Sequence, residues 1–219
     1  MAVKSAGGFE ALLRNGWDIN QPLGRTDPPA LASAFILLQR CSSLIYHRYI
    51  DDEKLVRRFI LHGADPNATC DWDLTPLSPT VSDAPLCRIK YFLRVGKSIE
   101  RGQLLHYSVL RKAPDWTEVL TLLLDKGASI DQIKYEDRPR TFWERSPFGL
   151  GTPLHKAAEL GRADIVSFPL KRGADRTIKD TKGETALEIA ERHGNTEVIE
   201  LLCGSWLSKI WSKWVSGLV

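Results

Sequence analysis

One motif occurs twice near the carboxyl end of the chain. Residues 152–173 read "TPLHKAAELGRADIVSFPLKRG" and residues 185–202 read "TALEIAERHGNTEVIELL". Their first residues, Thr152 and Thr185, are 33 positions apart. A fixed interval of this size is the signature of a repeat protein, in which one copy is too small to bury its apolar face alone. The chain is therefore expected to fold as stacked copies.

The residues of the first copy are those that a pair of short helices needs. Thr152 suits an N-cap, because its hydroxyl can accept a hydrogen bond from a free amide of the first turn. Pro153 suits the first helical position, where its missing N–H costs nothing. Gly161 ends the first helix, and Gly173 can take the left-handed conformation that ends many helices. This order predicts two short helices followed by a turn.

Short phrases around a glycine recur along the chain. They read "RNGWDIN", "LHGADPN", "RVGKSIE", "DKGASID" and "KRGADRT", and their glycines are Gly16, Gly63, Gly96, Gly127 and Gly173. The intervals are 47, 33, 31 and 46 residues, so two of them exceed the period by 14 and 13. We interpret the chain as a row of repeats with two insertions.

One insertion lies between Gly127 and Thr152. These residues are 25 positions apart, against 12 for the corresponding pair Gly173 and Thr185, which places 13 additional residues in an extended hairpin here. The other insertion is expected among the helices of the first repeat, near residues 37–52.

These residues resemble the ankyrin-repeat family, most clearly over 52–77, 115–131 and 149–204. The resemblance implies an all-α ankyrin-repeat solenoid of about five irregular helix-turn-helix units with β-hairpin-like loops, spanning residues 1–204. In that family the motif histidine ties neighbouring repeats together through hydrogen bonds. The positions that the resemblance assigns to the structural motif are Thr75, Pro76, Leu77, His106, Thr152, Pro153, Leu154, His155, Gly173, Thr185 and Gly194.

Two prolines stand where the repeat pattern expects a continuing helix. Pro79 follows Ser78 in the first helix of its repeat, and Pro169 lies in a second helix, where other copies have leucine. An interior proline removes an amide hydrogen bond and typically costs about 3 kcal/mol. We expect Pro169 to bend or shorten its helix and to carry no function.

Composition and motifs exclude several classes of protein. A net charge of +3 with interleaved acids and bases is too mild to indicate nucleic-acid binding. No catalytic or phosphate-binding motif is present, so we expect neither enzyme activity nor a cofactor. The chain has four cysteines whose spacing matches no metal or disulfide framework, namely Cys41, Cys70, Cys87 and Cys203. Without a secretory signal or an apolar run of ~18 residues, a monomeric cytoplasmic or nuclear protein is expected.

The insertion, residues 133–149, is the main candidate for partner binding. Arginine with large aromatic residues is the composition of binding hot spots, and the candidates here are Arg138, Arg140, Phe142, Trp143 and Arg145. Lys134, Tyr135 and Phe148 lie in the same segment. Two alternatives stay open: Phe142, Trp143 and Phe148 fold back as a structural cover, or the loop is disordered.

Further candidates follow from the resemblance alone. Ankyrin-like proteins generally bind through hairpin tips and the inner face of the first helices. By position, this marks Trp72, Tyr107, Lys156, Lys182 and Ile189 as residues that contact a partner.

The last residues, 205–219, read "SWLSKIWSKWVSGLV" and place apolar and polar residues on opposite sides of a helix. The exposed flank of a last repeat needs a cap with a polar outer face, so we expect an amphipathic capping helix. A helix that fills a partner's groove, or one that lies on a membrane surface, is the alternative.

The sequence therefore predicts a non-catalytic scaffold that binds a protein of unknown identity. Two other interpretations stay open. The chain starts inside a repeat, which favours a recognition fragment of a larger multidomain signalling protein, and the tryptophan-rich tail allows a membrane-surface adaptor.

Overall fold

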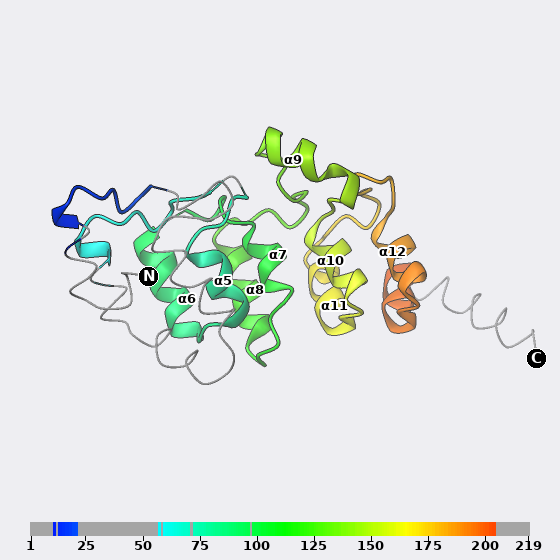
Figure 1. Cartoon of the computed structure of the whole chain (residues 1–219). Coiled ribbons are helices and arrows are strands. Elements are labelled where there is room, and N and C mark those ends of the chain that lie inside the picture. Colours follow the sequence, from blue (N-terminus) through cyan, green and yellow to red (C-terminus); the bar gives the residue numbers. More distant parts are fainter. Residues whose placement is uncertain are drawn as a thin grey trace, which may run out of the picture. The chain divides into compact units, whose positions relative to one another are not determined.

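Pairs of short helices recur along the chain at the spacing that the sequence predicts (Figure 1). The computed structural model describes residues 11–21 except 12, and 57–204 except 58, 71 and 97. The chain divides into two compact lobes, the N-terminal lobe Met1–Gly102 and the C-terminal lobe Gln103–Val219. Each lobe is considered by itself.

The N-terminal lobe contains the helix pair α5 (Leu77–Asp83) and α6 (Leu86–Gly96), which pack against each other. Pro79 is the third residue of α5, where the amide has no acceptor within the helix. A proline is tolerated in this first turn, so the helix continues past Ser78 and Pro79. Val81 from α5 and Phe92 from α6 are buried.

The C-terminal lobe contains three helix pairs within its described residues. They are α7 (Leu104–Ser108) with α8 (Trp116–Asp125), α10 (Pro153–Glu159) with α11 (Ala163–Lys171), and α12 (Ala186–His193) with the helical residues 196–204. In Figure 1, α10 stands between α7 and α12, and it contacts both of them as well as α11. This is the stacked arrangement that the 33-residue period predicts.

Small residues allow the first helices to approach one another. Ala157 and Ala158 of α10 and Ala186 and Ala190 of α12 are all fully buried. Larger apolar side chains from the second helices complete the core, among them Val119, Leu123, Ile165, Val166 and Val198. Each of these contributes roughly 1.5–3 kcal/mol by leaving water, so the core is distributed along the row of repeats.

The hairpins of successive repeats are joined by one recurring contact. In the N-terminal lobe, Asn20 accepts a hydrogen bond at Oδ1 from the Asp65 amide (2.7 Å). In the C-terminal lobe, Asp131 accepts one at Oδ1 from the Asp175 amide (3.0 Å). Asn20 lies four positions after Gly16, and Asp131 lies four positions after Gly127. The contact therefore recurs at equivalent positions of the repeats.

Pro169 does not shorten its helix. The helix α11 continues through Pro169 to Lys171, two residues before Gly173, just as α8 ends two residues before Gly127. The proline ring is buried beside an apolar cavity of about 20 Å³ that is lined by residues such as Leu120 and Leu124. The expectation of a shortened helix was wrong, and the bend stays a prediction.

The insertion forms a helix instead of an extended hairpin. Residues Pro139–Arg145 make α9, and Ser146–Phe148 make a 3₁₀ turn, η2, that follows it directly. Pro139 occupies the first helical position, where its fixed backbone angle favours a helix. The prediction of an extended hairpin was therefore wrong. The insertion has no counterpart in the other repeats, so the spacing of the repeats gave its length but not its secondary structure.

The all-α fold class is confirmed for the part of the chain that the structure describes. Its only extended pairing there is an isolated bridge between Lys179 and Thr185 at the base of a hairpin. No helix among these residues is long and apolar enough to span a bilayer. The expected capping helix, 205–219, and the expected insertion near 37–52 lie outside the described residues.

Candidate binding surface

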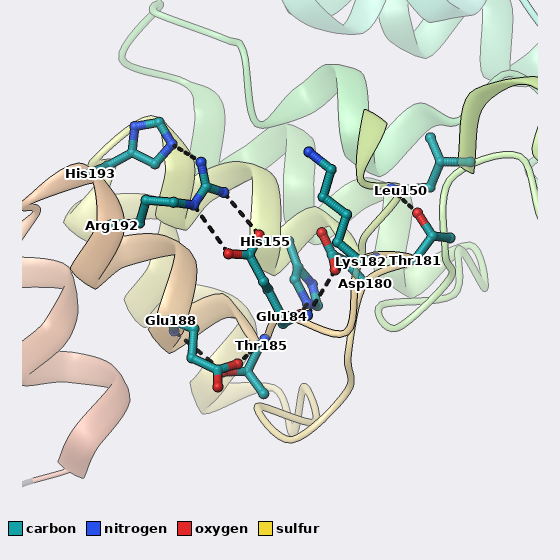
Figure 2. A network of polar contacts seen from close by, with 10 residues as sticks. All are labelled: Leu150, His155, Asp180, Thr181, Lys182, Glu184, Thr185, Glu188, Arg192 and His193. Carbon is teal, nitrogen blue, oxygen red and sulfur yellow. Dashed lines mark hydrogen bonds and ion pairs between the residues drawn. The ribbon is translucent and has the colours of Figure 1, made fainter. Parts of the chain in front are cut away.

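The motif histidine of α10 connects its own helix to the next hairpin. The Thr152 amide donates to His155 Nδ1 (3.0 Å), so Nδ1 accepts and the ring proton is on Nε2. His155 Nε2 then donates to the backbone carbonyl of Glu184 (3.2 Å), as Figure 2 shows. One side chain thereby caps its helix and ties it to the following repeat.

The corresponding residue makes the same tie in two other repeats. In the N-terminal lobe, Ser78 Oγ donates to the Gly102 carbonyl (2.7 Å). In the C-terminal lobe, His106 Nε2 is 3.0 Å from the Gly151 carbonyl. Each acceptor directly precedes the residue at the cap position of the next repeat. Ser78 thus takes the place of histidine, although its side chain is much smaller.

In the last described repeat this position holds Glu188. Its carboxylate accepts hydrogen bonds from the Thr185 amide (2.6 Å) and the Thr185 hydroxyl (2.9 Å). These contacts form a capping box at the start of α12. An ionised carboxylate has no proton to donate, so Glu188 caps its own helix without offering the forward tie that His155 makes.

The two motif histidines are structural groups at neutral pH. Burial lowers the pKa of His106 to about 3, and burial also lowers the pKa of His155. Both rings are then neutral, and the Nε2 atom of each lies at hydrogen-bond distance from a backbone carbonyl. A general base needs a free ring nitrogen facing a substrate, and these nitrogens are occupied.

Buried side chains anchor the insertion. Tyr135 is 8% exposed and Thr141 is 3% exposed. The Tyr135 amide donates to Gln103 Oε1 (3.1 Å), and both of these residues have the positive φ that side chains disfavour, 64° and 52°. Such conformations persist only where the surrounding structure fixes them. The start of the insertion is therefore firmly held.

The end of the insertion is fastened to the next hairpin (Figure 2). The Leu150 amide donates to Thr181 Oγ1 (2.8 Å), and the Thr181 hydroxyl donates to the Ser146 carbonyl (2.6 Å). The hairpin itself is closed by Asp180, whose Oδ1 accepts from the amides of Lys182 (2.8 Å) and Glu184 (2.9 Å). Both ends of the insertion are thus bound to the repeats.

The middle of the insertion presents two large aromatic side chains to solvent. Trp143 is 78% exposed and Phe148 is 70% exposed, whereas Phe142 is half-buried. The Arg145 guanidinium lies 5.7 Å from the centre of the Phe148 ring. A cover would bury these rings against the hairpins. The exposure of Trp143 and Phe148 argues against that alternative.

The Lys134 ammonium lies near two aromatic rings and two other positively charged side chains. Its ammonium is 5.6 Å from the ring centre of Tyr107 and 5.1 Å from that of Tyr135. Burial lowers the pKa of Lys134, and repulsion from Lys156 and Arg145 lowers it further. The insertion and α10 therefore hold three positive groups close enough to affect one another.

The remaining candidate residues have separate contacts. Lys156 pairs with Glu159 (2.8 Å), and exposed Arg140 pairs with Glu144 (3.3 Å). Lys182 extends its ammonium away from the hairpin contacts (Figure 2). Three candidates have simpler placements: Trp72 is half-buried in the N-terminal lobe, half-buried Arg138 directly precedes α9, and Ile189 is buried in α12.

Sequence reasoning missed the roles of two residues at the start of the insertion. Gln103 stands where the capping threonine is missing, and its side chain holds the start of the insertion instead. The absent threonine was a signal that this repeat uses another contact. Lys134 was noted only as part of a basic and aromatic segment, and no pattern singled it out. Among the described residues, no group of three or more His, Cys, Asp or Glu could hold a metal ion.

Comparison with known proteins identifies the repeats. The family model described as "Ankyrin repeats (3 copies)" matches residues 142–212. A probable E3 ubiquitin-protein ligase of Oryza sativa subsp. japonica, XBOS33, is 48% identical over 54 residues, 25% of this chain and 10% of that protein. A putative ankyrin repeat protein of Rickettsia bellii is 41% identical over 51 residues, 23% of this chain and 30% of that protein.

A longer match extends beyond the clearest repeats. A putative ankyrin repeat protein of Coxiella burnetii is 29% identical over 135 residues, 57% of this chain and 39% of that protein. The chain thus spans less than half the length of each of these relatives. The matched family agrees with the helix pairs, capping boxes and carbonyl ties described above. Residues 142–212 of the chain match the ankyrin-repeat family, and two of the relatives are named as putative ankyrin repeat proteins.

Proposed function

We propose that this chain is a non-catalytic scaffold that recognises a protein partner, with the insertion 133–149 as the specific element. The observation that carries the proposal is the contrast within the insertion. Tyr135 and Thr141 are buried and fix it, whereas Trp143 and Phe148 are exposed. Large aromatic side chains on a surface are the usual anchors of a protein interface.

Rigid presentation supplies the mechanism. Association costs free energy when loops and side chains must be ordered on binding. Here α9 is held at both ends, by the Gln103 contact and by the Thr181 contacts. The insertion is therefore already ordered in the free protein. Less free energy is lost in ordering it on binding, so more of the contact energy contributes to affinity.

The same proposal includes a monomeric chain in a reducing compartment, the cytoplasm or the nucleus. Among the cysteines that the structure describes, Cys87 and Cys203 are free thiols. Unpaired cysteines are typical of proteins that work where thiols stay reduced.

The proposal is tested by capture from a cell extract with immobilised protein. The wild type is compared with Trp143→Ala and with Leu160→Ala, which removes a different exposed apolar side chain, in the same lobe but outside the insertion. We expect one set of proteins to be lost with Trp143→Ala and retained with Leu160→Ala, at an unchanged melting temperature. Equal capture by all three proteins would contradict the assignment.

A further inference from the structure

The insertion places positive charges beside its exposed aromatic rings. Lys134 and Arg145 come from the insertion, and Lys156 comes from α10. Lys182 lies at the base, because a Cβ added to Gly149 would be 3.4 Å from Lys182 Cδ. These four residues are called the cationic cluster below.

Among the described residues, an acid pairs with Lys156 but none pairs with Lys134. Glu159 pairs with Lys156 at 2.8 Å. Its negative charge also raises the pKa of Lys134, in opposition to the neighbouring cations. Within the described residues, the Lys134 ammonium contacts the rings of Tyr107 and Tyr135, and no ion pair of it is present. A half-buried cation that lacks a carboxylate partner has lost hydration without full compensation.

We propose that the partner segment bound at this surface is acidic, with carboxylates facing the cationic cluster and an apolar side chain against Trp143 and Phe148. This inference rests on the proposed function and adds the chemistry of the partner. Charge complementarity favours carboxylates, because opposite charges across an interface steer encounter and suppress wrong partners. The exposed rings require that the segment also carries an aromatic or aliphatic residue.

A nucleic acid fits the surroundings less well. Acids accompany these cations. Glu159 pairs with Lys156, Asp180 lies beside Lys182 against Gly149, and Glu144 pairs with nearby Arg140. The net charge of the whole chain is only +3. Nucleic-acid surfaces usually carry an uninterrupted basic stripe. A short peptide can place single carboxylates opposite the cations, whereas a nucleic acid carries a negative charge at every phosphate and would also face these acids.

The cluster also links binding to protons. The pKa of Lys134 is lowered by burial and by Lys156 and Arg145, and Glu159 opposes this change. A bound carboxylate would favour the charged ammonium and raise the pKa of Lys134. Binding is then strongest below the lowered pKa of the free protein. It weakens as the pH rises through that pKa, by up to about tenfold per pH unit.

The test uses fluorescence anisotropy with a labelled synthetic peptide in which glutamate alternates with phenylalanine. A matched peptide has glutamine in place of glutamate, and a single-stranded oligonucleotide is the third probe. The protein variants are Lys134→Met, Lys134→Arg and Lys171→Met, the last removing an exposed charge on α11. Thermal melting of each variant shows whether it folds.

We expect the glutamate peptide to bind the wild type at least about tenfold more tightly than the glutamine peptide. Lys134→Met should remove most of this difference, whereas Lys134→Arg and Lys171→Met should retain it. Equal binding of both peptides, or equal loss with Lys134→Met and Lys171→Met, would overturn the proposal. Tighter binding of the oligonucleotide, with loss in Lys134→Met, would assign the cluster to nucleic acid instead.

The two proposals fail in different ways. If both peptides bind equally and Trp143→Ala still removes partners from the extract, the surface binds protein but not through acidic residues. If Trp143→Ala leaves capture unchanged, the insertion is not the interaction element and the proposed function fails first.

Discussion

Replacing Pro169 by leucine should stabilise the protein. The helix α11 already continues through this position, so leucine can fit without a change of backbone path. A leucine supplies the amide that can donate to the Ile165 carbonyl, which is worth about 0.5–1.5 kcal/mol. It also has more volume to place in the apolar cavity of about 20 Å³ beside the ring, worth ~0.5 kcal/mol at the usual cost of a cavity. Relief of the proline ring's clash with the preceding turn adds to both.

One effect opposes this gain. Proline restricts the unfolded chain, and its removal returns about 0.4–1 kcal/mol of conformational freedom to that state. The net expectation is a stabilisation of about 1–2 kcal/mol, the balance of these contributions. For a chain of this size that corresponds to a rise of about 2–8 °C in melting temperature.

The assay is thermal unfolding followed by circular dichroism, with Pro153→Ala as the control. Pro153 is at the first helical position of α10, where a proline costs nothing. Its replacement should leave the melting temperature unchanged or lower it. An unchanged or lower melting temperature for Pro169→Leu would refute the argument that this proline strains its helix.

Three other perturbations have outcomes that the structure determines. Burial lowers the pKa of His106 in the folded protein to about 3, against an ordinary value of about 6.5. The neutral ring therefore stabilises the folded state fully above pH 6.5, and the free energy of unfolding falls as the pH drops below that, by up to about 1.4 kcal/mol per pH unit. His106→Gln should flatten this slope in urea titrations at several pH values. Thr181→Val removes the contacts to Leu150 and to the Ser146 carbonyl, and hydrogen exchange at the Leu150 amide should become faster while exchange in α12 stays the same. Trp143→Ala removes a side chain that is 78% exposed, so its melting temperature should stay within about 2 °C of the wild type, and a larger loss would show that the ring packs on the scaffold.

The repeat architecture was predictable because each copy carries its own local instructions. Thr152, Pro153 and Gly173 specify a cap, a first turn and an end, and these choices depend only on neighbouring residues. The period then fixed where successive helices would lie. The repeat that begins at Gln103 was harder to recognise, because a left-handed glutamine replaces the capping threonine there.

The candidate binding surface was predictable only in part. Aromatic and arginine residues marked the insertion correctly as unusual, but its length gave no indication of α9. Which aromatics are buried depends on contacts distant in sequence, such as those of Gln103 with Tyr135 and of Thr181 with Leu150. Local patterns cannot indicate contacts of this kind. The gathering of Lys134 with Lys156 has the same origin, since they come from different elements.

In the proposed function, a firmly anchored insertion makes the contact with a partner. Hydrogen-exchange mass spectrometry of the protein with and without a captured partner tests this most directly. We predict that protection on binding concentrates in residues 134–149 and in the hairpin around Lys182, while α8 and α11 exchange as in the free protein. Protection confined to α8 and α11, with the insertion unchanged, would contradict the claim.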